Sequence, residues 1–126
     1  MADARLVSQS VSVDDIRVEA LIGVHAHERL HRQSLNISVT LIIDSPLSDD
    51  LAATVDYNLI VDECRTLADE GIALIETFVH RLAHRLIACT GVRRAEVRVE
   101  KRGALANGMA GAAIVLERDQ NQPAPR

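Results

Sequence analysis

The chain has 126 residues, of which 48% are hydrophobic and 25% are charged. These proportions are close to those of an average globular protein, and they exclude a wholly disordered chain. The formal net charge of −4 excludes the strongly basic surface with which many proteins bind nucleic acids.

Alternation of apolar and polar residues predicts two strands in the first third of the chain. The apolar residues of the first strand are Ile16, Val18, Ala20, Ile22 and Val24. A polar stretch at residues 25–32 separates it from the second strand, which ends before Ser45 and Pro46. The apolar residues of the second strand are Leu35, Ile37, Val39, Leu41 and Ile43. Polar residues alternate with them, so we expect a sheet with one buried face and one wet face.

The period of the apolar residues then changes, and two helices are predicted. The first begins with a cap at Asp56 or Asn58 and ends at Gly71. The second ends at Gly91, and its apolar residues are three and one positions apart, as in a helix that lies on a sheet. This stripe comprises Ile75, Phe78, Val79, Leu82, Ala83, Leu86 and Ile87.

Two further strands follow, one in which Ala95, Val97 and Val99 alternate with charged residues and one at residues 112–116. The order ββααββ predicts an α+β fold, in which two helices cover one face of a four-stranded antiparallel sheet. The outer strands leave unpaired edges, which closure of several sheets into a barrel would remove, so we expect an oligomer. We expect one domain over residues 1–126, with a core at about 14–118 and a flexible polar tail at 119–126.

Two reactive residue types occur only once and narrow the choice of sites. Lys101 is the only lysine among 14 basic residues, and Tyr57 is the only tyrosine. A lysine can lose its proton when it is desolvated, whereas an arginine effectively never does. Lys101 has the parity of the apolar residues of its strand, but it is a solvated loop residue if the strand ends at Glu100. For Tyr57 the alternative is a packing residue whose hydroxyl reaches water.

Two glutamates are further candidates. Glu76 follows Leu74 and Ile75 at the start of the second predicted helix, and Glu28 lies in the polar stretch after the first strand. The alternative for both is an exposed charge, and a carboxylate in a first helical turn also interacts favourably with the helix dipole.

The five histidines raise the alternative of a zinc site. A pattern of the form HxHxxxH comprises His25, His27 and His31, and an i, i+4 pair comprises His80 and His84. The helical pair lacks the glutamate of an HExxH motif, because Arg81 follows its first histidine. Metal binding is therefore the less favoured interpretation. The sequence also has neither a glycine-rich phosphate loop nor a nucleophile elbow.

The cysteines and the first residues indicate the compartment. Cys64 and Cys89 have neither the spacing of a redox motif nor the density of a disulfide scaffold. Residues 1–12 lack the basic start and apolar run of a secretory signal, and no stretch reaches the ~18 apolar residues of a membrane span. We expect a cytoplasmic protein with reduced cysteines.

Five segments lie in an order and spacing that fit one known family. They are Ile22-Gly23-Val24-His25-Ala26-His27-Glu28 with Gln33 ahead of a strand, Val55-Asp56-Tyr57, Leu74-Ile75-Glu76, Arg98-Val99-Glu100-Lys101 and Ile114-Val115-Leu116-Glu117-Arg118. Each segment alone is weakly specific, but together, in register on the predicted ββααββ order, they resemble the dihydroneopterin aldolase family. The resemblance runs from about Ile16 to Arg118.

The resemblance implies a tunnelling fold, in which four subunits form a barrel with the helices outside. Two such barrels stack into an octamer, and the active sites lie between neighbouring subunits. It implies a lyase of folate biosynthesis that cleaves 7,8-dihydroneopterin by a retro-aldol reaction to 6-hydroxymethyl-7,8-dihydropterin and glycolaldehyde. The family uses neither a metal nor an organic cofactor, and its members often also epimerise the side-chain hydroxyl.

The resemblance also implies roles for single residues. Lys101 matches the general acid/base, and Tyr57, contributed by the neighbouring subunit, would pack on the ring and relay a proton. Glu76 matches the anchor of the pterin's amino group and adjacent N–H, a bidentate and charge-assisted pairing. Glu28 would orient the side-chain hydroxyls. Main-chain groups would complete the recognition of the ring edge at two residues, Ile75 and Val55.

The sequence departs from the family at two positions. Arg102 follows Lys101 where many members have proline, and His27 precedes Glu28 where the residue is often aromatic. Because Arg102 could bind a phosphate, the alternative of a dihydroneopterin triphosphate 2′-epimerase stays open, as does a non-catalytic pterin-binding ring of the same fold. A relative of the pyruvoyl-tetrahydropterin synthase type would need its zinc-binding histidines within the second strand, and here they follow the first.

Overall fold

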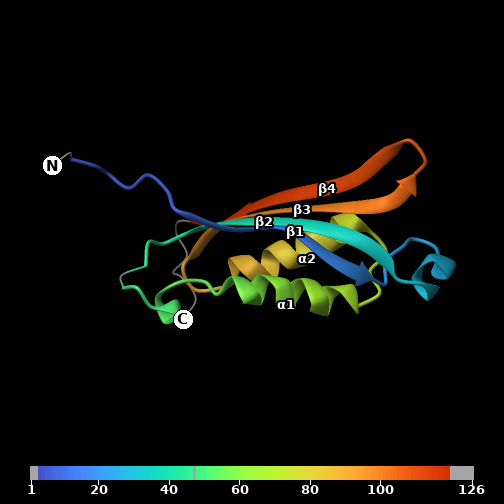
Figure 1. Cartoon of the computed structure of the whole chain (residues 1–126), viewed down its shortest axis with the longest axis horizontal. Helices are drawn as coiled ribbons and strands as arrows, with labels where there is room; N and C mark the ends of the chain where they lie inside the picture. The colour runs from blue at the N-terminus through green and yellow to red at the C-terminus, as the bar shows by residue number, and fades with distance from the viewer. Residues whose placement is uncertain (1–2, 47, 120–126) are drawn as a thin grey trace.

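The computed structural model describes residues 3–46 and 48–119, so residues 120–126 of the predicted tail lie outside the described residues. The fold is a four-stranded antiparallel sheet with two helices on one side of it (Figure 1). The strands are β1 (Ser10–Ala20), β2 (Gln33–Ile43), β3 (Val92–Leu105) and β4 (Gly108–Glu117). The helices are α1 (Tyr57–Ala68) and α2 (Ile75–Ile87), with 3₁₀ helices η1 (Ala26–Leu30) and η2 (Leu51–Ala53). The predicted ββααββ order is confirmed.

The two faces of the sheet differ as the alternation predicts. The inward residues of β2 are all buried, whereas the residues between them are partly exposed. The inward face packs on the apolar stripe of α2, of which Phe78, Leu82 and Leu86 are fully buried. The other face is polar on both central strands. It carries Asn36, Ser38, Thr40, Arg94, Glu96, Arg98 and Glu100, and two ion pairs join Arg94 to Glu96 (3.3 Å) and Arg98 to Glu100 (3.5 Å).

A bulge makes β1 begin earlier than the alternation predicts. The strand starts at Ser10 and not at Ile16, and its pairing with β2 shifts register between Val13 and Ile16. Asp15, within this bulge, has a φ of 57°. The extra residue reverses the parity, so Val11 and Val13 lie on the same face as Ile16 although their numbers are odd. A strict period of two cannot detect such a strand.

The chain leaves the sheet at the end of β1. The Leu21 N–H donates to the Ala68 carbonyl (2.8 Å), and Ile22 pairs in parallel with Ile72. The residues after β1 thus contact the connection between α1 and α2, and the predicted extension of the strand to Val24 is wrong.

The predicted helix boundaries hold for α1 but not for the end of α2. Asp56 caps α1, since its Oδ1 accepts from the Asn58 N–H (2.9 Å), and α1 ends before Gly71. α2 ends at Ile87, earlier than predicted, and Gly91 lies instead in the turn that leads into β3. Neither helix within the described ranges is long and apolar enough to cross a membrane.

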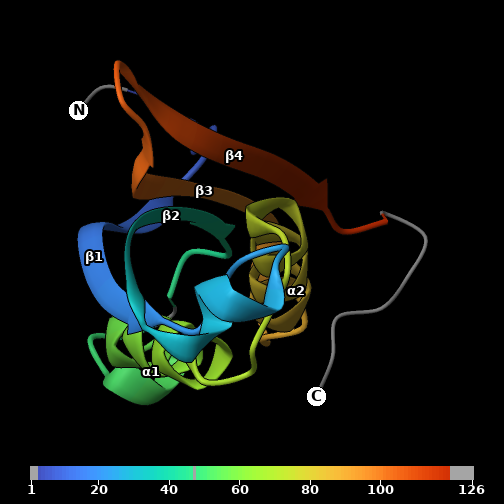
Figure 2. The ribbon, with the colours of Figure 1, turned by 90° about the vertical axis from the view of Figure 1, so that its right-hand side faces the viewer.

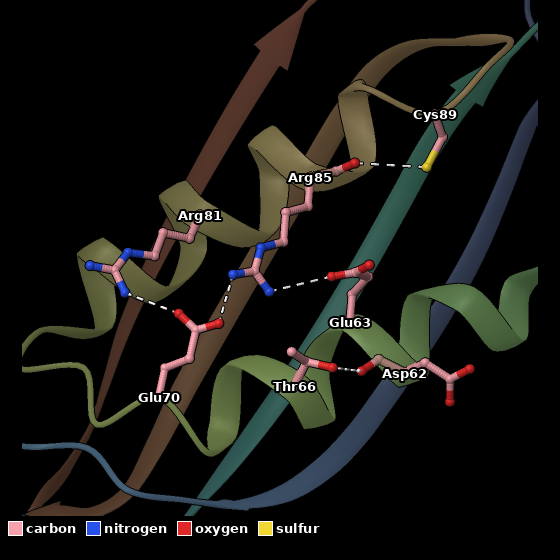
Figure 3. Close-up of polar contacts among 7 residues, drawn as sticks. All are labelled: Asp62, Glu63, Thr66, Glu70, Arg81, Arg85 and Cys89. Atoms are coloured by element: carbon pink, nitrogen blue, oxygen red, sulfur yellow. Dashed lines mark hydrogen bonds and ion pairs between the residues drawn. The ribbon is translucent and has the colours of Figure 1, made fainter. Parts of the chain in front are cut away.

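Ion pairs join the two helices on their solvent side. Arg85 of α2 donates to Glu70, just after α1, at 2.6 Å and to Glu63 of α1 at 3.4 Å (Figure 3). Arg81 also contacts Glu70, at 3.2 Å. The hydrogen bond to Glu70 and the nearby negative charges raise the pKa of Arg85. All four side chains are partly exposed, so the network fixes the orientation of the helices more than it stabilises the fold.

Candidate functional site

Lys101 lies within β3 and not after it. Its backbone is opposite Leu35 of β2 and Ala110 of β4, so neighbouring strands pair with it on both sides. Its side chain is only 15% exposed and lies on the face of the buried Val97 and Val99. The alternative of a solvated loop residue is therefore wrong, and the single lysine is a partly desolvated amine on a central strand.

Glu28 is the side-chain partner of this amine. It lies on η1, and its Oε2 accepts from Lys101 Nζ at 3.3 Å. Its Oε1 accepts from the His25 N–H at 3.2 Å. The hydrogen bond from His25 and then the one from Lys101 lower the pKa of Glu28. The carboxylate is therefore ionised at neutral pH, and it holds the lysine side chain in a fixed direction.

The start of α2 lies at the same end of the sheet. The Gly23 N–H, at the start of the loop that carries Glu28, donates to the Ile72 carbonyl at 3.2 Å, and α2 begins at Ile75, shortly after Ile72. Figure 2 looks at this end of the molecule, with η1 in front. Glu76 is exposed in the first turn of α2, where a carboxylate is favoured by the helix dipole and is accessible to a ligand.

Val55 and Tyr57 lie at the opposite end. Val55 lines a cavity of about 290 Å³ together with Ile43 and Gly91, which flank the far end of the β2–β3 pairing. Lys101 is opposite the other end of β2, and at ~3.3 Å per residue the two ends are about 26 Å apart. Figure 1 shows the start of α1 and η1 at opposite ends.

The predicted site residues thus form two groups within one chain. The structure brings Glu28 and Lys101 into contact, with Ile75 and Glu76 at the same end, and it separates Val55 and Tyr57 from them. Tyr57 is 59% exposed, which leaves its ring free for contact with another molecule. The spacing of these residues in the sequence gives no indication of this division, because it depends on which end of the sheet each connection reaches, although the resemblance to the family implies that Tyr57 comes from another subunit.

A larger cavity, of about 590 Å³, opens at the Val55 end, and none of the predicted site residues lines it. Two ion pairs lie along it, Arg93 with Asp44 and Arg94 with Glu96, and it is also lined by Glu117, Arg118 and Asp119. Because none of the predicted site residues lies there, the candidate chemistry remains with Lys101.

The histidines do not build a zinc site in the described part of the chain. The rings of His25 and His27 are stacked with centroids 5.5 Å apart, and those of His80 and His84 are 4.4 Å apart. No group of three or more histidine, cysteine, aspartate or glutamate side chains among residues 3–46 and 48–119 is placed to hold a metal ion.

Comparisons with known proteins show the family and the fold of the chain. Residues 11–117 match the model of the dihydroneopterin aldolase (FolB) family. A dihydroneopterin aldolase of Streptomyces coelicolor is 30% identical over 95 residues, which are 72% of this chain and 80% of the relative. The dihydroneopterin aldolase of Burkholderia thailendensis, solved bound to guanine, has a TM-score of 0.74 and 25% identity over 89% of this chain and 93% of its own. That of E. coli, solved with neopterin, has a TM-score of 0.75 and 24% identity over 88% of this chain and 99% of its own. The chain therefore belongs to the dihydroneopterin aldolase family.

Proposed function

We propose that this chain cleaves 7,8-dihydroneopterin by a retro-aldol reaction to 6-hydroxymethyl-7,8-dihydropterin and glycolaldehyde, a step of folate biosynthesis. The observation that carries the proposal is the position of Lys101, the single lysine of the chain: its side chain is largely buried on β3, and its Nζ lies 3.3 Å from Oε2 of Glu28. The match of residues 11–117 to the family supports the choice of substrate.

In this mechanism Lys101 acts as a general base in its neutral form. It takes the proton of the substrate's 2′-hydroxyl, directly or through one water, and the C1′–C2′ bond breaks as glycolaldehyde forms. The electron pair of that bond moves into the pterin ring, which becomes an enamine. The pterin ring is therefore the electron sink, and no imine between the substrate and lysine is needed. The hydroxyl of Tyr57 relays the proton that converts the resulting enol to product.

Glu76 is the proposed anchor of the pterin ring. Guanine and neopterin, the ligands of the two related structures, share an amino group next to a ring N–H. A carboxylate accepts from both donors at once, and the exposed Glu76 at the start of α2 can provide this pairing. Main-chain groups at Ile75 and Val55 complete the recognition of the edge of the pterin ring. Glu28 would orient the side-chain hydroxyls, since it lies against Lys101.

A second subunit is proposed to complete the site. Val55 and Tyr57 are about 26 Å along the sheet from Lys101, so they cannot serve the same substrate within one chain. Strands β1 and β4 are the edges of the sheet and can pair with other chains. A ring of four chains would bring Tyr57 of one subunit to Lys101 of the next, and two rings would stack into an octamer.

Mixing two inactive variants tests the shared site. Lys101→Met and Tyr57→Phe chains, unfolded together and refolded at equal amounts, should regain about a quarter of the wild-type activity, because that fraction of interfaces combines two intact groups. Each variant refolded alone is the control. If the mixture stays as inactive as its components, both groups belong to one chain and the proposal of a shared site is wrong.

Product analysis separates the proposed function from its alternatives. Purified protein is incubated with dihydroneopterin and, in parallel, with its triphosphate, and products are separated by chromatography. Glycolaldehyde from dihydroneopterin supports the aldolase, and EDTA should change the rate little because no metal or organic cofactor takes part. The exposed Arg102 beside Lys101 favours the epimerase as the second candidate. This enzyme would invert the configuration at the 2′ carbon of dihydroneopterin triphosphate without cleaving the side chain. Binding without any product would indicate a non-catalytic ring.

The proposed compartment is the cytoplasm, which is a reducing environment. Both cysteines are free thiols, Cys64 buried and Cys89 partly buried. Free thiols are typical of proteins in a reducing compartment.

A further inference from the structure

One side chain spans the loop that carries Glu28. Gln33, the first residue of β2, donates from its Nε2 to the Ile22 carbonyl at 2.6 Å and to the Glu28 carbonyl at 3.3 Å. Both partners are carbonyl oxygens, which can only accept, so the amide must present its nitrogen to them. The amide nitrogen of Gln33 thus links Ile22, which precedes the loop, to Glu28, which contacts Lys101.

The loop also has little freedom to hold Glu28 in another way. Gly23 has a φ of 149°, and a Cβ added there would lie 2.3 Å from the Cβ and 3.0 Å from the Oε2 of Glu28. The Glu28 side chain is therefore packed directly on the glycine backbone. A second hydrogen bond links the two ends of the same segment, since Arg29 Nη1 donates to the Gly23 carbonyl at 2.5 Å. These contacts pack the Glu28 side chain against Gly23, with its Oε2 toward Lys101.

We propose that Gln33 is a positioning residue that holds the carboxylate of Glu28 against Lys101. It acts through Glu28 and does not touch the substrate. Without its amide, two partly buried carbonyls lose their donor, and the segment between them is free to move Glu28 away from the amine. The kinetic consequence rests on the proposed function, but the contact itself is a property of the chain without substrate.

The single lysine allows the contact to be observed directly. Protein labelled with [ε-¹³C, ζ-¹⁵N]lysine gives one Nζ resonance, which reports on Lys101 alone. Gln33→Met keeps the length of the side chain and removes both hydrogen bonds. Gln33→Glu keeps its shape and places an acceptor against two acceptors. In both variants the resonance should move from its wild-type position toward that of Glu28→Gln, in which the lysine has lost its anionic partner.

Arg32→Met is the matched control. Arg32 is the neighbouring residue in sequence, and its Nη1 donates to the Glu19 carbonyl at 3.0 Å and to Asp69 at 2.7 Å, away from the loop. Removing these bonds should leave the Lys101 resonance unchanged. A shift in the control as large as in the Gln33 variants would show that the resonance responds to any loss of hydrogen bonds in this region.

Kinetics provide the second readout. Gln33→Met should lower kcat/KM for dihydroneopterin about tenfold, while the affinity for unsubstituted pterin, which lacks the side-chain hydroxyls, stays within about twofold. In the Glu28→Gln background the same change should cost less than about twofold, because effects that act through one residue do not add. If Gln33 only supported the fold, Gln33→Met would also weaken pterin binding, and its effect on kcat/KM would add to that of Glu28→Gln.

Two results would overturn the proposal: a Lys101 resonance unmoved in both Gln33 variants, or full additivity with Glu28→Gln. Absence of turnover in the wild type would instead refute the proposed function. The resonance would still decide the role of Gln33.

Discussion

Replacing Lys101 separates the chemistry of the amine from its charge. Lys101→Met removes both, whereas Lys101→Arg keeps a positive charge that can donate to Glu28 but cannot act as a base. Either change alters only a side chain, because the backbone of Lys101 is paired with Leu35 and Ala110 on both sides. The amine and Glu28 are both partly exposed, so their ion pair contributes little to folding and either variant should fold.

The expected loss follows from the role assigned to the amine. A positioned general base accelerates a reaction by roughly 10²–10⁴-fold, or about 2.7–5.4 kcal/mol in the transition state. Both variants should therefore lose kcat by that factor, while the affinity for pterin, for which Glu76 at the start of α2 is the proposed anchor, changes little. Glycolaldehyde release measures the first quantity, and quenching of pterin fluorescence measures the second. Turnover of Lys101→Arg within about tenfold of wild type would refute the assignment of Lys101 as the base.

Four other experiments test the site and the fold. Glu76→Ala should weaken pterin binding at least about tenfold, as expected when a charge-assisted hydrogen bond is lost, and a defect in kcat alone would contradict its role as an anchor. Burial raises the pKa of Cys64 to about 12, so a thiol reagent at pH 8 should modify Cys89 well before Cys64, and mass spectrometry showing equal rates would argue against this packing. Because the unfolded chain loses the thiol proton first, the contribution of Cys64 to the free energy of unfolding should fall as the pH rises from about 8.5 toward 12, which urea unfolding at several pH values measures. Leu82→Ala, which empties a fully buried position between α2 and the sheet, should lower the free energy of unfolding by about 2–5 kcal/mol, and a loss below about 1 kcal/mol would mean that the core collapses around it.

The fold could be predicted from the sequence where its periodicity is undisturbed. β2 alternates without interruption, and the stripe of α2 keeps its spacing over the whole helix, so both elements are recognisable from local pattern alone. β1 was predicted only in part because the bulge at Asp15 reverses its parity, and its end was misplaced because Leu21 and Ile22 pair outside the sheet. Both errors arise from backbone conformation that depends on residues distant in sequence.

The members of the site could be proposed from the sequence, but their arrangement could not. Lys101 and Glu28 are 73 positions apart, and they meet because the register of β2 and β3 places Lys101 opposite Leu35, close to the loop before β2. No spacing in the sequence encodes that register. Gln33 belongs to one of the segments that resemble the family, but nothing in that pattern shows that its amide donates to the carbonyls of Ile22 and Glu28.

The polar outer face of the sheet determines what kind of assembly the chain can form. Arg94 and Arg98 already pair with glutamates of their own strand, and Asn36, Ser38 and Thr40 of β2 are polar, so the middle of this face is polar and its charges on β3 are matched within the chain. A barrel closed around it would enclose a water-filled lumen, and burying the face would release little free energy. The cohesion of such a ring must come from backbone hydrogen bonds at the edges of β1 and β4. A proline in the middle of β4 with its nitrogen facing outward should therefore prevent the proposed ring from forming and leave folded single chains.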